Sequence, residues 1–164
     1  MFDKIKDGML DSTEWRGINQ YFDSFLNKVG VRAIKLGGNG DISLTNYVWG
    51  NSEMPPHLPS PLYYNGRIYT IRDGGLFSCF NAENGKVSYR EKLGVSGSYF
   101  ASPVEAGGRI YIASRNGNVT VVEAGDNFKI LAKNDLKELI TATPALVDNK
   151  IYLRTEKALY AFGK

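Results

Sequence analysis

The segment SPLYYNGRIYTI, residues 60–71, indicates the fold because similar segments recur twice further along the chain. The second copy is SPVEAGGRIYIA at 102–113, and the third is TPALVDNKIYLR at 143–154, so the starts lie 42 and 41 residues apart. Each copy reads Ser/Thr-Pro, an apolar strand, a two-residue turn, a basic residue and Ile-Tyr. Asn-Gly and Asp-Asn between apolar runs are typical of hairpin turns, because these residues tolerate positive φ. The segment therefore predicts a β-hairpin that is repeated three times.

Another strand follows each copy of this segment. The continuations are RDGGLFSCF from Arg72, RNGNVTVVEA from Arg115 and TEKALYAFG from Thr155. A period of about 40–45 residues with about four short strands per unit is typical of a β-propeller blade. The abundance of Ile, Tyr, Val and Phe suits strands. The alternative is a β-sandwich whose hairpins agree by coincidence.

The repeats do not add up to a closed ring. An earlier stretch, VRAIKLGGNGDISLTNYVWG at 31–50, resembles the last half of a blade. Residues 30–164 are therefore predicted to form half a blade, two whole blades and half a blade, about three four-stranded blades in all. A closed propeller needs about four to eight. We expect a mainly β, partial β-propeller that is the C-terminal portion of something longer. Its exposed faces and edges predict self-association into a ring-like assembly of two chains, or an unstable monomer.

The N-terminal segment DKIKDGMLDSTE, residues 3–14, fits the twelve-residue loop of an EF-hand. The predicted Ca²⁺ ligands are Asp3, Asp7, the backbone carbonyl of Met9, Asp11 and Glu14. Gly8 allows the sharp turn, whereas Ile5 stands where an oxygen ligand is expected and weakens the site. The alternative is an acidic turn without metal, followed by a helix with Ser12 as its N-cap.

Apolar side chains recur at helical spacing after this loop, which predicts one face of a helix that stops at Gly30. They are Trp15, Ile18, Phe22, Phe25, Leu26 and Val29. Residues 1–29 are therefore expected to form a unit of their own, an EF-hand-like loop plus its exiting helix, ahead of the propeller.

The stretch CFNAENGKVSY at 79–89 resembles the repeat of the quinoprotein-type (PQQ-like) β-propellers. Gly85 and Lys86 match that repeat, and Tyr89 stands where the family has a tryptophan that docks against the neighbouring blade. In the half unit upstream, Trp49 occupies this position. The resemblance implies a propeller of this superfamily.

The resemblance does not by itself imply catalysis. Quinone-dependent dehydrogenases of the superfamily bind PQQ over the propeller axis, hold a Ca²⁺ with Glu, Asn and Asp side chains, and often carry a vicinal cysteine pair. Cys79 is the only cysteine of this chain, and no such triad maps onto it, which argues against PQQ binding here. We predict a non-catalytic binding or scaffold module. The alternative is the C-terminal portion of a PQQ-dependent dehydrogenase whose catalytic residues lie upstream, so the question of an enzyme stays open.

Composition restricts the partners and the compartment. The net charge of +3 is too small to favour nucleic acid or a membrane surface. No apolar run is long enough to span a bilayer, and no signal peptide is visible. We expect a protein partner or a small ligand on a propeller face, and a periplasmic or secreted location for the full-length parent. The single histidine, His57, makes a Ser–His or Cys–His nucleophile hard to assemble.

Overall fold

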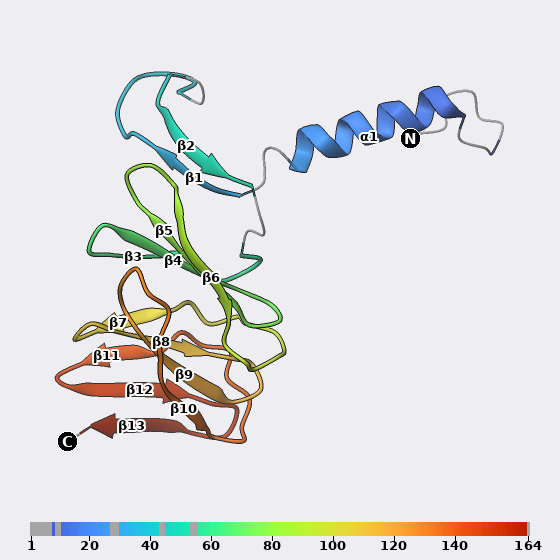
Figure 1. Ribbon diagram of the computed structural model, residues 1–164. Helices are drawn as coiled ribbons and strands as arrows, with labels where there is room; N and C mark the ends of the chain where they lie inside the picture. The colour runs from blue at the N-terminus through green and yellow to red at the C-terminus, as the bar shows by residue number, and fades with distance from the viewer. Residues whose placement is uncertain (1–7, 9–10, 27–29, 43–44, 53–55, 164) are drawn as a thin grey trace.

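The computed structural model describes residues 8, 11–26, 30–42, 45–52 and 56–163. Over these residues the fold is one helix, α1 (Ser12–Leu26), followed by strands in four separate antiparallel sheets (Figure 1). The prediction of a mainly β, partial propeller with a short helix ahead of it is confirmed. The described helix is neither long nor apolar enough to cross a membrane.

The four sheets follow one another along the chain, and we number them as blades 1 to 4. Blade 1 holds β1 (Val31–Ile34) and β2 (Tyr47–Asn51). Blade 2 holds β3 (Leu62–Tyr64), β4 (Arg67–Arg72), β5 (Leu76–Asn81) and β6 (Val87–Lys92). Blade 3 holds β7 (Val104–Ala106), β8 (Arg109–Ala113), β9 (Asn118–Glu123) and β10 (Ile130–Asp135). Blade 4 holds β11 (Ala145–Val147), β12 (Lys150–Arg154) and β13 (Leu159–Gly163).

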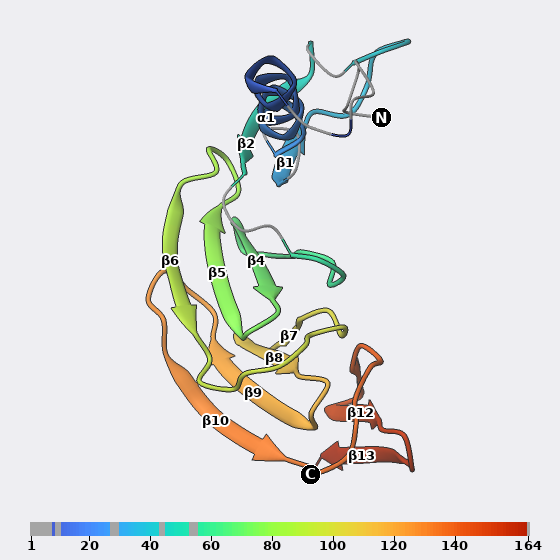
Figure 2. The same ribbon diagram turned by 90° about the vertical axis from the view of Figure 1, so that its right-hand side faces the viewer.

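Within each blade the strands pair with their neighbours in sequence order. Blade 4 has three strands, where the sequence predicted half a blade. Figure 2 shows the blades along an open arc, with blade 1 at one end and blade 4 at the other. Within the described residues, blades 2 and 3 each lie between two other blades.

The hairpin turns have the backbone conformation that the sequence predicted. Asn65 and Gly66 have φ values of 47° and 74°, and Asp148 and Asn149 have values of 49° and 59°. Two successive residues at positive φ match the right-handed twist of the flanking strands. These turns connect the first and second strands of blades 2 and 4.

Buried side chains gather between successive blades. The larger cluster joins blades 2 and 3 and comprises Tyr69, Ile71, Phe77, Cys79, Tyr89, Leu93, Tyr99, Ile110, Ile112 and Val122. The smaller cluster joins blades 3 and 4 and comprises Ala101, Ala113, Val119, Ile140 and Leu153. Because alternate residues of a strand face opposite sides, a blade with two neighbours buries both of its faces.

The last strands of blades 1, 2 and 3 share a register shift at the same place. The cross-strand pairs beside it are Ala33↔Trp49, Cys79↔Tyr89 and Val121↔Ala132. Trp49, Tyr89 and Ala132 therefore occupy one structural position in three successive blades. This correspondence identifies β2 as a fourth strand, equivalent to β6 and β10.

The start of α1 differs from the prediction in its capping residue. The Asp11 carboxylate accepts hydrogen bonds from the N–H groups of Thr13 and Glu14, both at 2.7 Å. The Asp11 N–H in turn donates to Glu14 Oε2 at 3.3 Å, which completes a capping box. The N-cap is therefore Asp11 and not Ser12. Trp15, which was expected on the apolar face, is 55% exposed, whereas Ile18 is buried.

Candidate functional site

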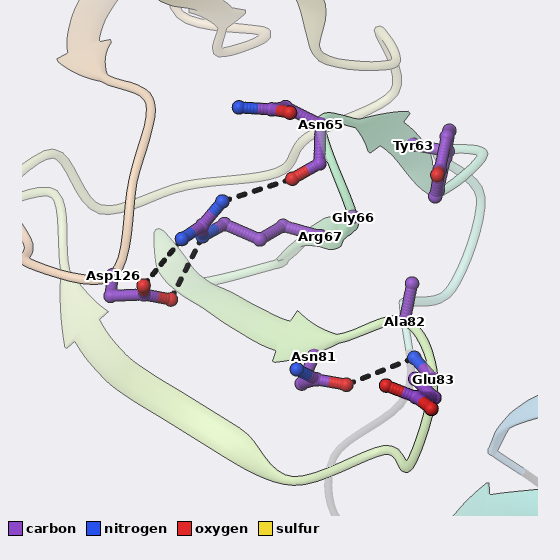
Figure 3. A pocket seen from close by; sticks show the side chains of 8 residues that line it. All are labelled: Tyr63, Asn65, Gly66, Arg67, Asn81, Ala82, Glu83 and Asp126. Atoms are coloured by element: carbon purple, nitrogen blue, oxygen red, sulfur yellow. Dashed lines mark hydrogen bonds and ion pairs between the residues drawn. The ribbon is translucent and has the colours of Figure 1, made fainter.

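A polar cavity of about 560 Å³ lies where blades 2 and 3 meet (Figure 3). Its lining comes from three turns and the strands beside them, and comprises Tyr63, Asn65, Gly66, Arg67, Asn81, Ala82, Glu83 and Asp126. The turn at Asn65–Gly66 and the turn after β5 belong to blade 2, whereas Asp126 follows β9 of blade 3. The cavity therefore depends on the packing of two blades against each other.

Arg67 and Asp126 connect the two blades across this cavity. Arg67 Nε donates to Asp126 Oδ1 at 2.8 Å, and Nη2 pairs with Oδ2, so the contact is bidentate. Arg67 Nη1 also donates to the carbonyl of Asn65 at 2.9 Å, and Ser88 Oγ donates to Asp126 Oδ1 at 3.2 Å. These contacts hold the guanidinium plane in one orientation.

The ion pair shifts the pKa values of both partners in the expected directions. The hydrogen bond from Arg67 lowers the pKa of Asp126 below its usual value, and the carboxylate raises the pKa of Arg67. Both groups are therefore charged at neutral pH. The pair is open to solvent, so its main effect is to position the side chains rather than to stabilise the fold.

The rest of the lining offers an aromatic ring and further polar groups. The Tyr63 side chain is 68% exposed on the rim of the cavity. The Asn81 side-chain oxygen accepts hydrogen bonds from the N–H groups of Glu83 and Asn84, at 2.9 and 3.2 Å. This arrangement can recognise a polar surface, and its lining residues contain no nucleophile paired with a base.

A second cavity, of about 500 Å³, lies at the opposite ends of the same strands and is lined by His57, Arg72, Asp73, Gly74, Leu76, Arg90 and Lys92. His57 Nδ1 lies 3.6 Å from Asp73 Oδ2, and Asp73 Oδ1 accepts the N–H of Tyr99 at 2.7 Å. The Asp73 carboxylate therefore contacts both the single histidine and the backbone of the loop that contains Tyr99. Three of the other six lining residues are cations, Arg72, Arg90 and Lys92, against the single carboxylate of Asp73, so the cavity on the face of blade 2 toward blade 1 carries a net positive charge.

Cys79 is buried inside the cluster between blades 2 and 3, as its alternation with strand residues predicted. Its thiol lies 3.7 Å from the carbonyl oxygen of Gly125, and burial raises its pKa. Because the thiolate is the nucleophilic form, this cysteine acts as a packing residue.

The predicted calcium ligands fall only partly within the described residues. Asp3, Asp7 and Met9 lie outside them, whereas Asp11 and Glu14 form the capping box at the start of α1. Over the described part of the chain, no three His, Cys, Asp or Glu side chains lie close enough together to hold a metal ion. The structure thus brings two of the five predicted ligands together, and the site itself stays a prediction.

The sequence did not point to Arg67 and Asp126. A signal for Arg67 existed, because a basic residue follows the turn in all three repeats, at Arg67, Arg109 and Lys150. Asp126 lies in a turn that gives no such signal, and the two residues are 59 positions apart.

Comparison with known proteins decides the family. The sequence profile described as outer membrane protein assembly factor BamB (PQQ_2) matches residues 45–130 and, again, residues 72–162. The chain belongs to this PQQ-like, BamB-type propeller family. The PQQ-like resemblance drawn from residues 79–89 is therefore confirmed, whereas the profile match does not reach the first 44 residues and lends no support to an EF-hand. No curated protein matches the chain by sequence.

Solved structures similar to this PQQ-like propeller share its fold at low sequence identity. BamB from Moraxella catarrhalis is 15% identical, with a TM-score of 0.60 over 72% of this chain and 37% of that one. Quinohemoprotein alcohol dehydrogenase ADHIIG from Pseudomonas putida HK5 is 14% identical, with a TM-score of 0.56 over 65% and 19%. The computationally designed Ika4 protein is 11% identical, with a TM-score of 0.60 over 75% and 76%. The chain thus spans about a third of the M. catarrhalis protein and a fifth of the dehydrogenase.

Proposed function

We propose that this PQQ-like propeller is a non-catalytic scaffold that binds a polypeptide partner at the cavity between blades 2 and 3. The observation that carries the proposal is Tyr63, a largely exposed aromatic side chain that lines the same cavity as the fixed guanidinium of Arg67. Tyrosine and arginine are enriched among the residues that dominate protein–protein binding energies. The family description, an outer membrane protein assembly factor, supports a protein ligand and an extracytoplasmic location.

The chemistry of the cavity favours a polypeptide over a small molecule. Small-molecule sites are lined mostly by apolar and aromatic side chains. Here an asparagine on each of two turns, an ion pair and Glu83 supply most of the lining, and Tyr63 supplies the one aromatic ring among the lining residues. Such groups suit the polar backbone and side chains of a protein segment.

A photoreactive residue at position 63 tests this proposal. With p-benzoylphenylalanine in place of Tyr63, irradiation in the native cell should yield a covalent adduct with one defined polypeptide. The adduct should be lost when Arg67→Ala is added, while the circular dichroism spectrum at the temperature of the experiment stays that of the folded chain. The matched control is the same photoreactive residue in place of Leu36, which is 91% exposed and does not line the cavity. Equal adducts from both positions, or none from position 63, would contradict the proposal.

We also propose that the N-terminal loop binds Ca²⁺ weakly. The support within the described residues is that one turn holds the carboxylates of Asp11 and Glu14 together. Because Ile5 offers no oxygen, we expect a dissociation constant of about 0.1–1 mM, as in weak extracellular sites. Calorimetry should detect binding that disappears in Glu14→Gln, while the helix content stays the same because glutamine also completes a capping box. Absence of binding in the unmodified chain would overturn this proposal.

The alternative function, part of a PQQ-dependent dehydrogenase, has a simple test. Its support is the fold similarity to a quinohemoprotein alcohol dehydrogenase. The chain is incubated with PQQ, Ca²⁺ and an alcohol, and reduction of an electron-accepting dye is followed. Dye reduction that depends on the alcohol would replace the scaffold proposal with an enzymatic one.

A further inference from the structure

The turn after β5 in blade 2 and the turn after β9 in blade 3 are equivalent, but they carry different charges. The Asn81 N–H donates to the Lys86 carbonyl at 2.8 Å, and the Glu123 N–H donates to the Lys129 carbonyl at 2.9 Å. Asn81 therefore corresponds to Glu123, and Lys86 corresponds to Lys129. In blade 3 the two side chains form an ion pair, since Lys129 Nζ lies 3.1 Å from Glu123 Oε2. The blade 3 turn thus neutralises its own lysine.

The blade 2 turn carries one acidic and one basic side chain that do not pair. Asn81 offers no carboxylate to Lys86, and its side-chain oxygen instead accepts the N–H groups of Glu83 and Asn84. Glu83 stands two residues after Asn81, where blade 3 has Gly125. Both Glu83 and Lys86 are exposed, and neither forms an ion pair with another described residue. One carboxylate and one ammonium group of this turn therefore remain available to a ligand.

The two charges line two adjoining cavities between blades 2 and 3. Glu83 lines the cavity of about 560 Å³ described above. A further cavity, of about 350 Å³, is lined by Asn81, Asn84, Lys86, Val87, Ser88 and Asp126. Asn81 and Asp126 line both cavities, so the two adjoin, and we call them together the seam groove. It reaches from Tyr63 on β3, the first strand of blade 2, to Val87 on β6, the fourth.

The two cavities of the seam groove carry charges of opposite sign. Arg67 and Asp126 form a bidentate ion pair, so their charges cancel (Figure 3). Apart from this pair, Glu83 is the only charged residue that lines the larger cavity, and Lys86 is the only one that lines the smaller cavity. The cavity that contains Tyr63 is therefore negative, and the cavity that contains Lys86 is positive.

We propose that the seam groove binds an extended polypeptide segment that places a basic side chain against Glu83 and an acidic side chain against Lys86. The inference rests on the proposed function, because it gives the chemistry of the polypeptide partner. An extended segment advances about 3.3 Å per residue, so neighbouring residues on one face can enter two adjoining cavities. Complementary charges also fix the direction of the segment, since the reversed segment would bring like charges together.

A second photoreactive position separates this inference from the proposed function. Asn84 is exposed and lines the smaller cavity but not the larger one. With p-benzoylphenylalanine in its place, irradiation should capture the same polypeptide as position 63 does. Peptide mapping by mass spectrometry should place both contacts in one segment that holds an acidic and a basic residue.

The outcomes of this experiment are distinct. An adduct from position 63 alone, or contacts in a segment that lacks an acidic residue, would overturn the inference and leave the proposed function standing. Adducts from neither position would overturn both.

Matched lysine variants test the acidic contact. The probe is a synthetic peptide with the sequence of the captured segment, and fluorescence anisotropy measures its dissociation constant. Lys86→Glu should raise that constant at least about 5-fold, because repulsion replaces attraction. Lys129→Glu is the matched control, since Lys129 is equally exposed at the equivalent place in blade 3, and should leave the constant nearly unchanged. Equal effects of the two variants would contradict the proposed contact.

A charge swap tests the direction of the segment. Glu83→Lys combined with Lys86→Glu exchanges the signs of the two cavities and leaves the net charge of the chain unchanged. The doubly substituted chain should prefer a peptide in which the acidic and basic residues have changed places, whereas the unmodified chain should prefer the original peptide. Circular dichroism checks that both chains are folded. A doubly substituted chain that still prefers the original peptide would refute the proposed arrangement.

Discussion

One structural position in the last strand of each blade shows how a single side chain determines the contact between neighbouring blades. We call it the docking position. In blade 1, Trp49 Nε1 donates to the carbonyl of Ala82 at 2.9 Å, and its ring covers Gly85. In blade 2, Tyr89 fills the same position, but its buried hydroxyl has no hydrogen-bond partner among the residues that the structure describes. In blade 3, Ala132 is too small to dock, and an apolar groove of about 410 Å³ stays open between blades 3 and 4. The groove is lined by Tyr111, Val119, Val121, Asn134, Asp135, Leu136, Ile151, Leu153 and Phe162.

The buried hydroxyl of Tyr89 leads to the first prediction. A buried polar group without a partner costs about 1–3 kcal/mol, so Tyr89→Phe should raise the free energy of unfolding by about 1 kcal/mol. Tyr69→Phe is the matched control, because the Tyr69 hydroxyl accepts the Gly125 N–H at 3.0 Å. It should lower the free energy of unfolding. Guanidinium denaturation measures both, and a destabilised Tyr89→Phe chain would show that the hydroxyl has a partner after all.

The ion pair between Arg67 and Asp126 predicts a pH dependence. The pKa of Asp126 is lowered in the folded state, so its stabilising contribution is complete above the ordinary carboxyl pKa of about 3.9 and is lost as the pH falls through the folded value. Asp126→Asn should therefore be less stable than the unmodified chain at pH 7, and the difference should vanish at low pH. Thermal unfolding from pH 7 to pH 2 measures it. If the difference in stability between the two chains does not change with pH, the charge of Asp126 does not contribute to it.

At the scale of the element, the contact between Trp49 and Gly85 joins blade 1 to blade 2. Gly85 has φ of +71°, and a Cβ on it would overlap the indole ring. Gly85→Ala should therefore displace Trp49 and cost about 1–3 kcal/mol. Fluorescence in a Trp15→Phe background, which leaves Trp49 as the remaining tryptophan, should shift to longer wavelength. Gly66→Ala, where an added Cβ meets no neighbour, controls for the positive φ alone.

Local patterns at this scale were predictable, and contacts between distant segments were not. The turn at Asn65–Gly66 followed from the positive φ that these residues tolerate, and the strands followed from their alternation. The prediction of Ser12 as the N-cap was wrong, because serine and aspartate are both good N-cap residues. The reciprocal hydrogen bond between Asp11 and Glu14 distinguishes them. Arg67 pairs with a residue of the next blade, and no local rule gives that pairing. The sequence could predict the blade, but not the cavity that two blades make together.

At the scale of the whole molecule, two faces of the arc carry cations where the interface between blades 2 and 3 carries apolar side chains. Arg154 lies on the face of blade 4 away from blade 3, in the position that Ile71 has in blade 2. The face of blade 2 toward blade 1 presents Arg72, Arg90 and Lys92 around the second cavity. At the interface between blades 2 and 3, by contrast, Ile71 and Phe77 are fully buried.

This difference between the faces predicts unequal costs for the same kind of substitution at equivalent positions. Phe77 pairs with Ile71 as Leu159 pairs with Arg154, but Phe77 is fully buried between blades 2 and 3, whereas Leu159 is 68% exposed. Phe77→Ala should therefore lower the free energy of unfolding by about 3–5 kcal/mol, and Leu159→Ala by about 0.5 kcal/mol or less. Guanidinium denaturation measures both values. A loss of several kcal/mol for Leu159→Ala would mean that the face of blade 4 is covered in solution, because only a buried leucine costs that much to truncate.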